Sequence, residues 1–119
     1  MIQSFNCKET EKIFNGIISR KFPSVIQTRS FNKLAAIHAS LTLDDLRSPP
    51  SNHLEQLKGD RIGQYSIRIN DKYRICFEWK NGNAYNVEIV DSIEQTIQWE
   101  MNDGDFELQN VQQVFPPIR

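Results

Sequence analysis

Residues 54–79, LEQLKGDRIGQYSIRINDKYRICFEW, contain the clearest structural pattern in the sequence. Apolar residues alternate with polar ones over 65–69 and again over 73–79, and a short polar turn separates the two runs. Strict alternation in two adjacent runs is typical of an antiparallel hairpin with one buried face. The polar parity carries Arg68 and Arg74, so we expect the second face of this hairpin to present cations, an arrangement suited to phosphate.

A third strand is predicted directly after the hairpin. Asn81-Gly82 is the strongest short turn signal between strands, and residues 84–91 alternate again, with Val87 and Ile89 on one parity. We therefore expect three consecutive antiparallel strands, a meander. Parity also places four aromatic side chains in the core, with base stacking left open as an alternative: Tyr65, Tyr73, Trp79 and Tyr85.

Two amphipathic helices are predicted before the hairpin. Residues 8–20 place four apolar side chains on one stripe: Ile13, Phe14, Ile17 and Ile18. Pro23 sets a helix boundary, and residues 24–41 carry a second stripe that ends at Leu41, with His38 beside it as a structural residue. The fold class is therefore α+β, with a two-helix hairpin packed on a small antiparallel sheet.

Length and composition point to one soluble domain. The 119 residues suit a single modest core. No run of about 18 apolar residues exists, and the N-terminus lacks the pattern of a signal peptide, so we expect a cytoplasmic protein without membrane contact. Cys7 and Cys76 have no metal-ligand spacing, and the sequence holds no glycine-rich phosphate loop. We therefore predict free thiols, no metal and no cofactor.

Charge divides the chain after residue 91. Residues 1–91 hold 13 Lys and Arg against 10 Asp and Glu, whereas residues 92–119 hold one Arg against five acids. Such a shift marks a composition boundary, so we predict a domain over residues 1–91 and an acidic C-terminal extension, helical or partly disordered, over residues 92–119. The extension either covers the basic face of the domain or is solvated, and both alternatives stay open.

Several strings of this sequence resemble one known family. They are PPSN at 49–52, LKGDR at 57–61, SIRIND at 66–71, YRICF at 73–77 and VEIVD at 87–91. Over residues 1–91 the chain resembles the HigB (plasmid maintenance killer) family, which belongs to the RelE-like toxins of toxin–antitoxin systems. The string at 57–61 argues against the related ParE branch, whose members poison gyrase.

The resemblance implies a fold, an activity and partners. The family fold is two helices on a curved antiparallel sheet, and its members are mRNA interferases that cut messages, typically in the ribosomal A site. A small HigA-like antitoxin with a helix-turn-helix neutralises them, and the complex represses its own operon. We therefore expect mRNA, the ribosome and an antitoxin as partners, and operator DNA only through the antitoxin complex.

The arginines of the hairpin are candidates for contact with RNA phosphate. Arg74 is the candidate for the scissile phosphate, because a guanidinium can form two bonds to phosphate. Its alternative role is a cross-strand ion pair with Glu78 or Glu88. Arg68 is a candidate for a contact to the RNA backbone, and its alternative is a place on a solvated face.

The basic turn at residues 58–61 supplies two further cations. Lys58 and Arg61 are expected to bind phosphates of mRNA or of ribosomal RNA, and Lys58 is also a catalytic candidate. Arg61 has the alternative of pairing with Asp60 or Asp71.

Proton transfer has three candidate residues near the family's motif positions. Members of the family usually end their last strand in Asp-Tyr-His, and here Asp91 is followed by Ser92 and Ile93. At the position of an upstream family histidine stands Glu55, a weak base when exposed because its ordinary pKa is about 4.3, and His53 lies just before it. Two alternatives stay open: an active endoribonuclease, or a weakened toxin that still binds its antitoxin and regulates its operon.

Overall fold

The computed structural model describes residues 1–91, and the predicted hairpin is its centre. Strands β2 (Gln64–Arg68) and β3 (Tyr73–Lys80) pair antiparallel. Strand β4 (Asn83–Asp91) returns along β3. The Asn81-Gly82 turn between β3 and β4 has positive φ at both residues, 51° and 79°, as a type I′ hairpin turn requires. The predicted meander is confirmed.

A short fourth strand extends the sheet beyond the prediction. Strand β1 (Glu55–Gln56) pairs antiparallel with Ser66 and Tyr65 of β2, so the sheet order is β1-β2-β3-β4. Two residues are too few to show an alternating pattern, which is why the sequence did not reveal this strand.

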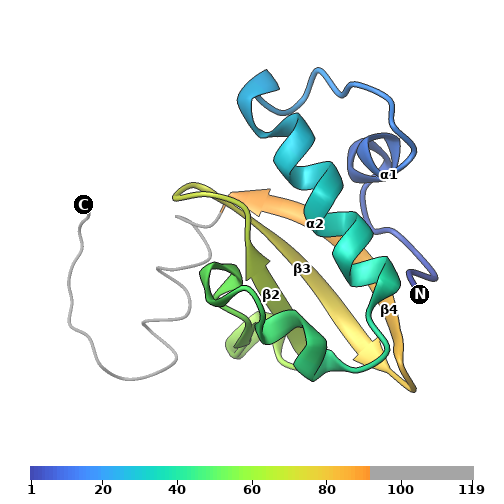
Figure 1. Cartoon of the computed structure of the whole chain (residues 1–119), viewed down its shortest axis with the longest axis vertical. Helices are drawn as coiled ribbons and strands as arrows, with labels where there is room; N and C mark the ends of the chain where they lie inside the picture. Colours follow the sequence, from blue (N-terminus) through green and yellow to red (C-terminus); the bar gives the residue numbers. More distant parts are fainter. Residues whose placement is uncertain (92–119) are drawn as a thin grey trace.

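Two helices cover one face of the sheet (Figure 1). They are α1 (Lys8–Phe14) and α2 (Gln27–Ala39), and the 3₁₀ turn η1 (Ser24–Ile26) leads into α2. Further 3₁₀ turns lie at η2 (Leu43–Arg47), η3 (Pro50–Asn52) and η4 (Gly59–Arg61). The core includes five fully buried side chains from α2 and the sheet: Leu34, Ile37, Ile67, Ile75 and Phe77. The α+β fold class is confirmed.

Helix α1 is shorter than predicted, because it ends at Phe14 and not at Arg20. Gly16 has a φ of 80°, and the N–H of Ile17 donates to the carbonyl of Lys12 at 2.8 Å. This bond and the left-handed glycine are the Schellman helix stop. Helix α2 also ends before its predicted limit, and Leu41 is exposed instead of buried.

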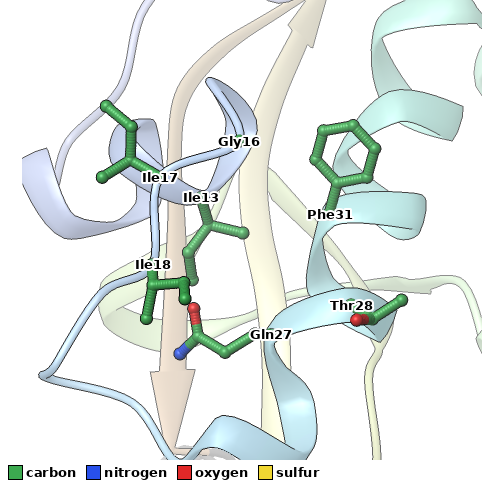
Figure 2. A pocket seen from close by; sticks show the side chains of 7 residues that line it. All are labelled: Ile13, Gly16, Ile17, Ile18, Gln27, Thr28 and Phe31. Atoms are coloured by element: carbon green, nitrogen blue, oxygen red, sulfur yellow. The ribbon is translucent and has the colours of Figure 1, made fainter.

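The early stop of α1 leaves apolar side chains at the surface. Ile17 and Ile18 are 55% and 77% exposed, where the stripe predicted them to be buried. Figure 2 shows them with Ile13 on one side of a groove, and with Phe31 of α2 on the other. The groove has a volume of about 250 Å³. It is therefore a consequence of where the helix ends.

A bulge in β4 changes which face Tyr85 occupies. The β3–β4 register shifts between Cys76 and Glu78, and Asn86 has a φ of 54°. The N–H of Asn86 donates to Ser4 Oγ at 2.8 Å, and its amide donates to Glu78 at 3.0 Å. Tyr85 lies opposite Glu78, on the face turned away from the helices. The predicted core position of Tyr85 is therefore wrong, because one extra residue inverts the parity.

Other predictions from the sequence have mixed outcomes. Three aromatic side chains do pack against the core as predicted: Tyr65, Tyr73 and Trp79. His38 is structural, since its Nδ1 accepts the N–H of Ile2 at 3.1 Å. Cys7 and Cys76 are free thiols.

The predicted extension at 92–119 lies outside the described residues. None of the described helices is long and apolar enough to cross a bilayer.

The position of the helix stop can be tested by stability. Ile13→Ala should lower the free energy of unfolding by about 2–5 kcal/mol, because Ile13 is only 3% exposed. Ile18→Ala should change it by less than about 0.5 kcal/mol, because Ile18 is already in solvent. Urea unfolding of the two variants measures this. Equal losses would contradict a helix that ends at Phe14.

Candidate functional site

The sheet face turned away from α1 and α2, here called the site face, carries most of the predicted polar candidates. Ile67, Ile75 and Phe77 point toward the helices, so the residues that alternate with them point to the opposite face. Cross-strand partners share a face, and the register aligns these pairs: Glu55 with Ser66, Ser66 with Cys76, Arg68 with Arg74, and Cys76 with Glu88. All four strands therefore contribute side chains to one surface.

Arg74 lies at the base of this face and is buried. Its Nε donates to Ser66 Oγ at 2.9 Å, and its Nη2 donates to the carbonyl of His53 at 2.7 Å. The same Nη2 is 3.5 Å from Glu55 Oε1. Burial lowers the pKa of Arg74, and the Glu55 charge opposes that shift. The predicted face is correct, but the side chain is only 9% exposed and does not stand open to solvent.

A buried amide fixes the loop that brings His53 to Arg74. Asn52 is 1% exposed and donates to the carbonyl of Leu46 at 3.1 Å, while its Oδ1 accepts from Lys33. His53 follows in the left-handed region with a φ of 46°, a conformation that is uncommon for residues other than glycine. Its carbonyl reaches Arg74 from there, while its side chain is exposed. From the sequence, Asn52 was only a residue of the PPSN string at 49–52, with no predicted structural role.

Arg61 of η4 also reaches the site face, where it contacts side chains of β2 and β4. Its Nη1 donates to Gln64 Oε1 at 2.9 Å and to Glu88 Oε2 at 3.0 Å. Arg61 and Glu88 are each 18% exposed, so this is a largely buried ion pair. Lys58 is at the other end of the same turn and is exposed. The N–H of the buried Leu57 donates to the carbonyl of Gln64 at 2.9 Å and holds the turn against β2.

Cys76 lies in the middle of the site face, where the charges of Arg61 and Arg74 both influence the pKa of its thiol. Burial raises the pKa of its thiol to about 11, while the charges of Arg61 and Arg74 pull the pKa down and Glu88 pushes it up. A raised pKa keeps the thiol protonated near neutral pH, so Cys76 is a packing residue and no nucleophile.

Asp91 is separated from Arg74. Val90 lies opposite Arg74 in the ladder, and Asp91, one residue further, lies opposite Tyr73. Asp91 Oδ2 is 3.9 Å from Lys72 Nζ, and the carboxylate lines a cavity of about 360 Å³ together with Arg61. Alternation thus points Asp91 away from the face that holds Arg74.

Arg68 lies opposite Arg74, at the end of β2. Its Nη2 pairs with Asp71, and its Nε donates to the carbonyl of Asn70 at 3.2 Å. The structure therefore gathers Arg74, Glu55 and His53 into one cluster. Arg61 and Arg68 flank that cluster on the site face.

Ser66 of the site face was not singled out from the sequence, and Tyr85 was predicted to lie in the core. Ser66 orients Arg74, and only its parity could have revealed this. Tyr85 reaches the face through the bulge, and its one sequence signal is the following Asn86, a residue type that tolerates positive φ.

The cluster holds a fixed cation beside a carboxylate. A buried guanidinium, held by hydrogen bonds, can stabilise negative charge that develops on a bound group. The carboxylate beside it is 48% exposed and open to a ligand. Among residues 1–91, no group of three or more His, Cys, Asp or Glu gathers in a way that would hold a metal ion.

Comparison with known proteins identifies the family of this chain. A family model described as the RelE-like toxin of type II toxin-antitoxin system HigB matches residues 3–92. The chain belongs to the HigB-like toxins. The resemblance found in the sequence is confirmed, and membership in a type II toxin–antitoxin family implies an antitoxin partner.

Two relatives are instructive for this HigB-like toxin. Toxin HigB-1 of Vibrio cholerae is 43% identical over 67 residues, which are 56% of this chain and 70% of that protein. Endoribonuclease HigB of Proteus vulgaris is 32% identical over 91 residues, which are 76% of this chain and 98% of that protein. A protein of Haemophilus influenzae is similar as well, at 42% identity over 67 residues.

Proposed function

We propose that this HigB-like toxin is an endoribonuclease that cuts mRNA by attack of the substrate's own 2′-OH on the adjacent phosphate. The observation that carries the proposal is the cluster of Arg74, Glu55 and His53, assembled from the loop after η3, from β1 and from β3. A relative named Endoribonuclease HigB, aligned over nearly its whole length, supports the reaction class.

Arg74 is the proposed stabiliser of the phosphate. The transition state carries extra negative charge on the phosphoryl oxygens, and a preorganised cation there is often the largest single contribution to catalysis. Ser66 and the His53 carbonyl fix the guanidinium before the substrate arrives. Little reorganisation is then needed during the reaction.

Glu55 and His53 are the proposed proton-transfer residues. The exposed Glu55 carboxylate lies 3.5 Å from the Arg74 guanidinium. If Arg74 binds the scissile phosphate, Glu55 would lie close to the adjacent ribose, so it suits the role of base for the 2′-OH. The exposed His53 imidazole suits the role of acid for the leaving 5′-oxygen. Lys58 and Arg61 suit contacts with neighbouring phosphates, as cations on a surface turn do.

The proposed partners are those expected of a HigB-like toxin. The substrate is mRNA on the translating ribosome, and the antitoxin is a HigA-like protein with a helix-turn-helix. Operator DNA is reached only through that complex. Asp91 is proposed to act with Arg61 at the end of β4, since the two line one cavity.

Removal of single charges tests the proposed endoribonuclease. In cells that express the toxin without antitoxin, Glu55→Gln should lower the rate of mRNA cutting by about 10²–10⁴-fold, as expected for a lost general base. Arg74→Ala should abolish cutting. Mapping of 5′ ends in translated messages measures both, with Arg47→Gln as the control, because Arg47 is exposed and pairs only locally with Asp44.

Stability must be followed in the same variants. Arg74→Ala leaves Ser66 Oγ and the His53 carbonyl without their donor, and the loss at the buried Ser66 hydroxyl costs about 1–3 kcal/mol. Glu55→Gln removes the charge that offsets the burial of Arg74, but it keeps a polar side chain beside the guanidinium, so it should lower the unfolding temperature less than Arg74→Ala does. Undiminished cutting by a folded Glu55→Gln protein would refute Glu55 as the base, and undiminished cutting by Arg74→Ala would refute the site.

A weakened toxin is the second candidate function. It is favoured by the position of Asp91, which points away from Arg74, and by Ser92 and Ile93 in place of the family's usual Tyr-His. Such a protein would bind its antitoxin and regulate its operon while cutting slowly.

Restoring the family ending distinguishes the two candidates. If the chain is a weakened toxin, Ser92→Tyr together with Ile93→His should raise the cutting rate by about 10²-fold or more, the usual contribution of one acid or base. Antitoxin affinity should stay unchanged. A wild-type protein that already cuts well, with no gain in the double variant, would exclude the weakened toxin.

A further inference from the structure

A polar groove lies beside the proposed site, at the end of β2. Strand β1 covers residues 65–66 of β2, and the groove begins after them, at Arg68. It has a volume of about 590 Å³ and lies between α2 and the β2–β3 turn. Arg29 and Lys33 of α2 and Arg68 of β2 bring three positive charges to it, and we call it the cationic groove. Strand β1 pairs only with residues 65–66, so the end of β2 remains available on this side.

The two cations of α2 are held by neutral groups. Arg29 Nη1 donates to the carbonyl of Ile69 at 3.1 Å, and Lys33 Nζ donates to Asn52 Oδ1. Within residues 1–91 no carboxylate lies within ion-pair distance of either side chain. Asp71 lines the groove, but it pairs with Arg68.

The positive charges in the groove disfavour one another. Arg29 and Lys33 are four residues apart on one helix, where like charges repel. The pKa of Lys33 is lowered first by burial and then by the charge of Arg29. An anion bound between the two cations would remove this repulsion, and Asn32 and Ser51 line the groove with further hydrogen-bonding groups.

The groove continues directly from the proposed active site. Arg68 lies opposite Arg74 in the β2–β3 ladder, so it faces the site and also lines the groove. A strand of RNA whose scissile phosphate reaches Arg74 would pass Arg68 on its way to Arg29 and Lys33. Phosphate contacts of this kind position a nucleic acid without reading its sequence.

We propose that the cationic groove binds backbone phosphates of the single-stranded substrate RNA, next to the phosphate that is cut, through Arg29 and Lys33. The identity of the ligand as substrate RNA rests on the proposed function, whereas the presence of a phosphate-binding groove does not. Arg29 and Lys33 would then determine which phosphate of the mRNA lies at Arg74.

Binding of an uncleavable RNA tests this proposal apart from catalysis. A single-stranded 2′-O-methyl oligonucleotide lacks the attacking hydroxyl, so its affinity for the full chain is measurable whether or not the protein cuts RNA. Arg29→Gln with Lys33→Gln should weaken binding on the order of tenfold or more at low salt. The slope of log affinity against log salt should become shallower by about 1.4, or about 0.7 for each lost phosphate contact.

Two controls separate the groove from bulk charge and from folding. Lys12→Gln with Arg47→Gln removes the same charge from exposed positions that do not line the groove, and it should leave the slope unchanged. Arg29→Lys with Lys33→Arg keeps the charges and should retain the wild-type slope. Thermal unfolding shows that each variant is folded.

Three results would overturn the proposal. The first is an unchanged salt dependence of binding in the Arg29→Gln, Lys33→Gln variant, and the second is an equal change in the Lys12→Gln, Arg47→Gln control. The third is normal oligonucleotide binding by the Arg29→Gln, Lys33→Gln variant with weaker co-sedimentation of the toxin with ribosomes that carry no mRNA, which would assign the groove to ribosomal RNA. Loss of cutting by Glu55→Gln with normal oligonucleotide binding leaves the groove proposal supported, so the two proposals fail separately.

Discussion

The buried guanidinium of Arg74 is the constraint on which the site depends. A buried charge that lacks partners costs several kcal/mol, and here the partners come from β2, from β1 and from the loop after η3. Asn52, itself fully buried, holds that loop in the conformation that presents the His53 carbonyl. The same contacts that satisfy Arg74 therefore bring the Glu55 carboxylate and the His53 backbone to one guanidinium. Stability and the geometry of the cluster have one physical origin.

The arrangement of cations on the sheet divides the surface by role. Arg61 is paired with Glu88 and is largely buried, so it stiffens the turn that crosses the site face. Arg68 stands between the Arg74 cluster and the cationic groove, and it belongs to both surfaces. The groove cations on α2 are held by neutral acceptors. In the proposed function, Arg29 and the half-buried Lys33 attract the RNA backbone at longer range, while the buried Arg74 acts at short range.

The sequence predicted the parts of the fold that follow from local periodicity. Alternation located the hairpin and assigned Arg74 to the correct face, and Asn81-Gly82 located the turn into β4. Periodicity failed where a single residue changes the geometry. Asn15-Gly16 carried a helix stop that the apolar stripe through Ile17 and Ile18 concealed. Asn86 inserted a bulge that inverted the parity of Tyr85. The burial of Arg74 depends on a loop distant in sequence, so no local pattern contained it.

If Arg74 and Glu55 act together in the proposed reaction, a double-mutant cycle on the cleavage rate will detect the coupling between them. Arg74→Gln, Glu55→Gln and the double variant are compared with wild type in single-turnover cleavage of one mRNA. Residues that act as a unit show strongly non-additive losses. We predict that the double variant loses little more activity than the poorer single variant. Losses in rate that simply multiply would show that Arg74 and Glu55 act independently, and would rule out a joint role in catalysis.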